Sequence, residues 1–119
     1  MGGYTKKNLG DVENQAPKFD MPTEMDARFA RTDLEGETLG LSIMKLDSGF
    51  RIPFGHKHTG QEEVYVVVRG SGRVKVEDEI VELRQWDAIR FDKDTMRNME
   101  AGPDGIEYLA FGAGEDPLD

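Results

Sequence analysis

The chain has 119 residues, with 24 acidic against 15 basic side chains, a net charge of −9 and no cysteine. This length suits one domain, and without cysteine neither a disulfide framework nor a thiolate zinc site can form, so any metal must have nitrogen and oxygen ligands. The acidic balance disfavours nucleic acid and anionic membranes as partners, and no apolar run approaches the roughly 20 residues of a membrane span. Residues 1–20 are polar and lack the apolar centre of a signal peptide, so we expect a soluble, cytoplasmic protein.

Three segments differ in composition. Residues 1–22 are polar and predict an arm that is irregular or exchanged as a strand with a neighbouring copy. Residues 23–114 carry the apolar runs of a folded domain, and residues 115–119 form an acidic tail that we expect to be flexible. At the start of the domain, Thr23–Ala30 predicts either a short helical turn capped by Thr23 or an edge strand that includes Arg28–Arg31.

From Leu39 onward, short runs alternate apolar and polar residues between turn-forming residues, which is typical of all-β proteins. The predicted strands are Leu39–Asp47, Glu63–Arg69, Arg73–Glu77, Ile80–Arg84, Asp87–Phe91, Arg97–Glu100 and Ile106–Gly112. The predicted turns between them include Gly70-Ser71-Gly72 and Gly102-Pro103-Asp104-Gly105. So many short strands in one small domain indicate a sandwich or a barrel.

The only two histidines of the chain stand one residue apart in the segment GHKHTGQEEVYVVVRG, residues 55–70. Alternate residues of an extended strand face the same way, so His56 and His58 can direct two imidazoles to one point, where a carboxylate can join them. Such a set suits iron, manganese, nickel or zinc and leaves positions open for water or substrate. The plain alternative is two surface histidines on either side of Lys57.

This segment resembles the first conserved motif of the cupins, which reads H-x-H, three or four residues, E, six residues, G. The spacing selects Glu63, rather than Glu62, as the carboxylate, with Gly70 as the final glycine. The resemblance extends over about residues 39–112 and implies a double-stranded β-helix, or jelly-roll, barrel. It implies a metal site formed by His56, His58 and Glu63.

The second cupin motif, G, five residues, P-x-G, two residues, H, is altered at each diagnostic position. Trp86 stands for the first glycine, Asp92 for the proline, Asp94 for the second glycine and Arg97 for the third histidine. Because a guanidinium stays protonated and offers only donors, Arg97 cannot ligate a metal.

Three roles for Arg97 remain open. It can lie beside a metal held by His56, His58 and Glu63 and bind an anionic substrate; it can pair with Glu63 in place of the metal; or it can be a solvated side chain. The first role predicts a small-molecule oxygenase, isomerase or lyase that acts on an anionic metabolite. The second predicts a metal-free small-ligand-binding protein, such as a sensor or a storage domain.

Further site residues follow from the alternation along strands. If Glu63 and Arg97 face the interior, Tyr65, Met99 and Phe91 face it too and line a substrate pocket, although such residues in a small barrel are mostly core. Gln61 and Glu62 adjoin the histidines and are candidates to orient an imidazole, with simple exposure the alternative for Glu62.

Trp86, the only tryptophan, falls on a predicted turn, where so large an apolar surface needs a neighbouring strand or a second subunit to cover it. Cupins often pair as dimers, sometimes by lending an N-terminal strand. The resemblance therefore implies a homodimer in which the arm, residues 1–22, can serve as that strand.

Overall fold

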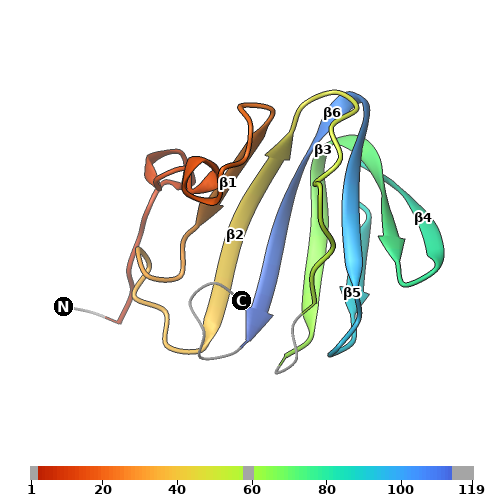
Figure 1. Ribbon diagram of the computed structural model, residues 1–119. Coiled ribbons are helices and arrows are strands. Elements are labelled where there is room, and N and C mark those ends of the chain that lie inside the picture. The colour runs from red at the N-terminus through yellow and green to blue at the C-terminus, as the bar shows by residue number, and fades with distance from the viewer. Residues whose placement is uncertain (1–2, 58–60, 114–119) are drawn as a thin grey trace.

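The computed structural model describes residues 3–57 and 61–113, which form six strands and two 3-10 helices (Figure 1). The elements are η1 (Leu9–Asp11), η2 (Ala16–Phe19), β1 (Met25–Phe29), β2 (Leu39–Leu46), β3 (Glu63–Val76), β4 (Glu79–Arg84), β5 (Ala88–Phe91) and β6 (Arg97–Ala113). The prediction of an all-β protein is therefore confirmed. His58 and the tail, residues 115–119, lie outside the described residues.

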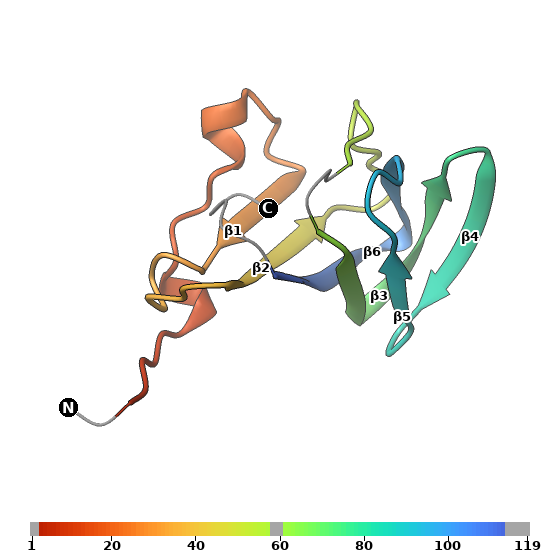
Figure 2. The same cartoon turned by 90° about the horizontal axis from the view of Figure 1, so that it is seen from below.

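All strand pairs are antiparallel, in the order β1-β2-β6-β3-β4, and β5 also pairs with β3. The C-terminal strand β6 thus lies between β2 and β3 (Figures 1 and 2). The loop between β2 and β3 returns along the start of β6, where Arg51 bridges to Glu100 and His56 to Arg97. Within the described part of the chain, no helix is long and apolar enough to cross a membrane.

Two of the predicted turns are wrong, because the strands continue through them. Gly70-Ser71-Gly72 lies inside β3 and residues 102–105 lie inside β6. Gly70 and Gly105 both have φ +77°, and a Cβ on Gly70 would lie 2.1 Å from the Gly105 carbonyl oxygen. The glycines allow the backbones of β3 and β6 to approach closely, and the register of β3 on β6 shifts between Gly70 and Gly72. The two strands therefore bend together at a β-bulge, and the chain does not reverse its direction there.

The helical turn predicted for Thr23–Ala30 is also wrong. Residues 25–29 form β1, which pairs with β2 from Met25 opposite Leu46 to Phe29 opposite Ser42. The alternative prediction of an edge strand is correct, although the strand begins at Met25 and not at Arg28. Met25 and Ala27 both face the core, and burial of every second residue is the pattern of a strand and not of a helix.

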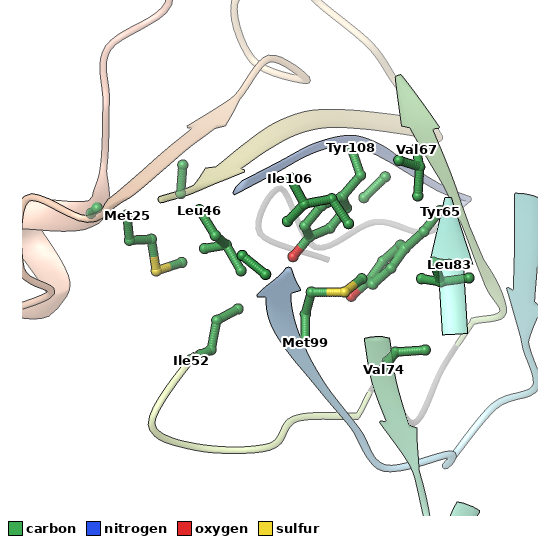
Figure 3. Close-up of a cluster of buried hydrophobic side chains, with 14 of the residues drawn as sticks. Met25, Leu46, Ile52, Tyr65, Val67, Val74, Leu83, Met99, Ile106 and Tyr108 are labelled. Carbon is green, nitrogen blue, oxygen red and sulfur yellow. The ribbon is translucent and has the colours of Figure 1, made fainter. Parts of the chain in front are cut away.

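The core lies on the inner face of the curved sheet (Figure 3). Tyr65 lies at its centre, with ring centroids 4.8 Å from Phe91 and 4.9 Å from Tyr108. Other buried members come from every strand except β5, from η2 and from the loop before β3: Ala16, Met25, Ala27, Leu46, Ile52, Val67, Val74, Leu83, Met99, Ala101, Ile106 and Ala110.

The described part of the predicted arm packs on its own chain. Val12 and Ala16 are buried, and the Asn14 side-chain oxygen accepts hydrogen bonds of 3.0 Å from the backbone N–H groups of Ala16 and Ala27. The Gln15 N–H donates to the Ala27 carbonyl at 2.7 Å. This segment is thereby fixed along β1. Its exchange with a second copy stays a prediction.

Trp86 ends the turn between β4 and β5 with 69% of its surface exposed. No strand in the described part of the chain covers this ring. The sequence predicted that either a neighbouring strand or a second subunit covers Trp86, and burial by a second subunit stays a prediction.

Candidate ligand-binding site

His56 and Arg97 are brought together by the backbone. The loop that carries His56 pairs with the first residue of β6, with N–H···O distances of 3.0 Å from His56 to Arg97 and 2.9 Å from Arg97 to His56. Glu63, the first residue of β3, lies opposite Gly112 of β6 and Phe91 of β5. Residues far apart in the sequence thus meet at one end of the barrel interior.

Arg97 and Glu63 form a buried ion pair. The Arg97 guanidinium donates through Nη2 to Oε1 of Glu63 and, at 3.0 Å, through Nη1 to the carbonyl of Thr95. Arg97 is 1% exposed and Glu63 5%. The pairing that the sequence left open between Arg97 and Glu63 is present, and the reading of Arg97 as a solvated side chain is wrong.

Two aromatic rings hold the guanidinium in place. Its central carbon lies 4.7 Å from the ring centroid of Phe91 and 5.8 Å from that of Tyr65. Both distances fall within the range of cation–π attraction, which is stronger away from water. The Arg97 Nε atom is buried and has no hydrogen-bond partner among the described residues.

The Tyr65 hydroxyl lies 3.2 Å from Nε2 of His56. Burial, together with the nearby negative charge of Glu63, raises the pKa of Tyr65 well above its usual value. Burial does the same for the pKa of Tyr108, with the neighbouring Tyr65 adding to the shift. Tyr65 therefore keeps its proton, and its hydroxyl can donate to the imidazole.

The described residues do not fit a divalent metal ion in this arrangement. Arg97 already engages the Glu63 carboxylate and places a positive charge beside it, and the Tyr65 hydroxyl engages Nε2 of His56. In residues 3–57 and 61–113 no group of three histidine or acidic side chains converges to hold an ion. A metal would have to displace the guanidinium from the only carboxylate of the predicted set.

A cavity of about 210 Å³ opens next to the ion pair. His56, Glu63 and Ser42 form its polar end. The rest of its lining comes from β1, β2 and β6, from η2 and the segment after it, and from the loop before His56: Phe19, Met21, Met25, Ala27, Phe29, Met44, Ile52, Phe54 and Ala110.

The predicted substrate-binding residues lie behind this cavity rather than in its lining. Tyr65, Phe91 and Met99 each have at most 3% of their surface exposed and belong to the core cluster, as the alternation of their strands predicts. Tyr65 and Phe91 contact Arg97, and neither they nor Arg97 is among the described lining residues.

Gln61 and Glu62, the predicted partners of an imidazole, point in different directions. Gln61 is buried against Gly112, and a Cβ on Gly112 would lie 2.8 Å from Nε2 of Gln61. The Gln61 amide has no hydrogen-bond partner in the described part of the chain. Glu62 is exposed and accepts a 2.9 Å hydrogen bond from Nη1 of Arg90. The exposed alternative for Glu62 is the one the structure shows.

Sequence reasoning missed the wall of the cavity. The sequence predicts an arm over residues 1–22 and leaves Thr23–Ala30 open between a helical turn and an edge strand, although Met25, Ala27 and Phe29 alternate as one face of a strand. Reading this alternation would have placed three of the lining residues on the inner face of the sheet.

The second motif retains its backbone shape. Trp86 and Asp94, which stand where cupins have glycine, have φ angles of 73° and 63°, in the left-handed region that glycine favours. Both positions thus have backbone angles that the glycines of the motif would adopt, and the assignment of Arg97 to the position of the third histidine stays a prediction.

Comparison with known proteins finds no matching family model and no matching curated protein. Among solved structures, a cupin protein from Bacteroides fragilis is 24% identical, with a TM-score of 0.78 over 100% of this chain and 91% of that one. KdgF from Halomonas sp. is 21% identical, with a TM-score of 0.71 over the full length of both chains. Oxalate decarboxylase from Bacillus subtilis, which has Mn(II) centres, is 23% identical; the match has a TM-score of 0.81 and covers 97–98% of this chain and about 30% of that one. The protein has the cupin fold, a jelly-roll of antiparallel strands.

Proposed function

We propose that this protein is a small-molecule-binding cupin in which the Arg97–Glu63 ion pair takes the place of the metal. The observation that carries the proposal is the burial of that pair, which engages the carboxylate that the motif resemblance implies as a metal ligand. The cavity next to it supplies room for a ligand, with His56 and Glu63 at its polar end.

In this proposal the buried side chains have positioning roles. Phe91 and Tyr65 hold the guanidinium by cation–π contact, and Tyr65 also fixes the His56 imidazole. Met99 packs behind them in the core. The ligand then meets a preformed polar end, because Tyr65 holds the His56 imidazole and Arg97 holds the Glu63 carboxylate.

The metal content of the protein and of two Arg97 variants tests this proposal. Protein incubated with manganese, iron, nickel or zinc and then dialysed should retain far less than one ion per chain. Arg97→His restores the histidine of the cupin motif, removes the competing charge and should gain a bound metal. Arg97→Met removes the same charge without adding a ligand, and so separates the two effects. Mass spectrometry of the elements gives the readout.

The competing proposal is the metal site of His56, His58 and Glu63, in which Arg97 turns from Glu63 to an anionic substrate. The cupin fold and the Mn(II) centres of oxalate decarboxylase favour it. Retention of one ion per chain by the unaltered protein, lost in His56→Ala, would establish this metal site and exclude the metal-free one.

A further inference from the structure

The lining of the cavity is almost entirely carbon and sulfur. Nine of its twelve residues are apolar, among them Met21, Met25 and Met44, whose flexible thioethers adapt to the shape of a ligand. The three polar residues, Ser42, His56 and Glu63, confine hydrogen bonding to one end. A ligand that fits this lining is apolar over most of its surface.

Among the described residues, the polar end provides no lysine or arginine for an anion. No lysine or arginine is among the described residues that line the cavity. The Arg97 guanidinium is 1% exposed and uses Nη2 for Glu63 and Nη1 for the Thr95 carbonyl. A carboxylate that entered would approach the Glu63 carboxylate without a lysine or arginine partner among the described lining residues, which is unfavourable in a buried place.

A neutral hydroxyl meets no such penalty. It can donate to a carboxylate oxygen of Glu63, since a carboxylate has about four acceptor sites and can accept several donors. It can also exchange a hydrogen bond with the imidazole of His56 or the hydroxyl of Ser42. The polar end is thus suited to one small uncharged donor group.

The size of the cavity limits the apolar part of the ligand. A dry engineered cavity of about 150 Å³ accommodates benzene, and the cavity here measures about 210 Å³. It therefore holds one ring with a few additional atoms. Phe19 and Phe54, which are 48% and 51% exposed, lie at the mouth of the cavity. Phe19 packs edge-to-face with Phe29, with ring centroids 6.3 Å apart, so aromatic rings are available to contact a ring of the ligand.

We infer that the cavity binds a neutral, mainly apolar molecule of about one ring, of the phenol class, with its hydroxyl directed to His56 and Glu63, and that it excludes small carboxylates. This inference rests on the proposed function and specifies its ligand. It differs from the anionic metabolite that the sequence predicted, because Arg97 faces Glu63 rather than the cavity.

Nuclear magnetic resonance of methyl-labelled methionine tests the inference. The probes are p-cresol, p-toluate, which has the same ring and methyl group with a carboxylate in place of the hydroxyl, and oxalate. p-Cresol should shift the methyl signals of Met21, Met25 and Met44, which line the cavity, and leave Met96, which is outside the lining, unchanged. p-Toluate should bind at least tenfold more weakly than p-cresol, and oxalate should leave the three lining signals unchanged.

A pair of variants checks that binding occurs inside the cavity. Ser42 points into it, so Ser42→Phe should weaken p-cresol binding at least tenfold, whereas Ile43→Phe, on the opposite face of β2, should not. Binding of p-cresol that is equal in both variants would overturn the inference. The wild-type titration does not depend on the folding of either variant.

The remaining outcomes separate the inference from the proposal on which it rests. If p-toluate or oxalate shifts the three lining methyls with equal or higher affinity, the neutral ligand class is wrong and a ligand-binding cavity remains. If no probe shifts them at millimolar concentration, the neutral ligand class and the binding function are both wrong.

Discussion

Arg97 keeps a full positive charge inside the barrel, where Glu63 is its one carboxylate partner among the described residues. Because an isolated buried charge is poorly solvated, Arg97→Met or Glu63→Leu alone should lower the free energy of unfolding by about 3–5 kcal/mol. The double variant Glu63→Leu/Arg97→Met removes both charges and should be clearly more stable than either single variant. Urea unfolding of the four proteins measures this coupling. Additive losses in the double variant would show that the pair is not coupled in the folded protein.

Tyr65 makes the free energy of unfolding depend on pH in the alkaline range. Its pKa is raised in the folded protein, whereas in the unfolded chain the phenol loses its proton near pH 10. Above that pH only the unfolded state releases the proton, so the free energy of unfolding should fall as pH rises and be unaffected by Tyr65 at lower pH.

Tyr65→Phe provides the comparison for this pH dependence. The variant should show a shallower decline in the free energy of unfolding above pH 10, and the raised pKa of Tyr108 should account for part of the decline that persists. Urea unfolding at several pH values gives the slopes. Equal slopes in the two proteins would exclude a contribution of Tyr65.

At the scale of the strands, the bend shared by β3 and β6 depends on glycine. Gly70→Ala should be severely destabilising, because its Cβ would lie 2.1 Å from the Gly105 carbonyl oxygen and its φ is +77°. Gly49 has a similar φ of +71° with nothing within 4 Å of a Cβ, so Gly49→Ala should cost only the conformational strain, about 1–2 kcal/mol. The difference in unfolding midpoints isolates the steric clash. Equal losses would show that the backbones of β3 and β6 can separate at the bend.

The same bend shows why part of the fold could be predicted from the sequence and part could not. Alternation located the strands around Tyr65 and Phe91 because burial on one face of a strand is a local pattern. Whether Gly70 and Gly105 reverse the chain or bend two paired strands depends on which strands are neighbours, and local sequence carries no such information.

The candidate site divides in the same way. The motif spacing selected Glu63 and Arg97, and the structure brings them together. The choice between a metal and an ion pair depended on the direction of one guanidinium in space. The apolar wall required knowing that Phe19 and Met44, from different elements, face the same cavity.

For the whole molecule, we predict a homodimer formed through the outer face of the sheet. Cross-strand register places six partly exposed or exposed apolar side chains there in two rows: Leu41, Phe111 and Val64, and Ile43, Leu109 and Val66. Arg28 with Asp26 at the β1 edge, and Arg90 with Glu62 at the other, give both edges of this face mixed charge. A second copy, with the same rows and the same edges, is therefore complementary to it.

Light scattering at micromolar concentration measures the assembly. The protein should have twice the mass of one chain, and Phe111→Lys, at a residue 40% exposed on this face, should reduce it to the monomer. Ile80→Lys, at a 53% exposed position of β4 outside the six-residue face, is the control and should remain a dimer. A monomeric wild-type protein would rule out this interface.

The place of β6 between β2 and β3 also affects how the chain folds as it is synthesised. Leu39 pairs with Ala113 and Val64 with Phe111, so β2 and β3 have no common neighbour until residues 97–113 have left the ribosome. Until then both strands present unpaired backbone edges, which are prone to aggregation. Folding of this domain must therefore be completed after translation of its last strand, and chaperones that shield open strand edges are expected to bind the nascent chain.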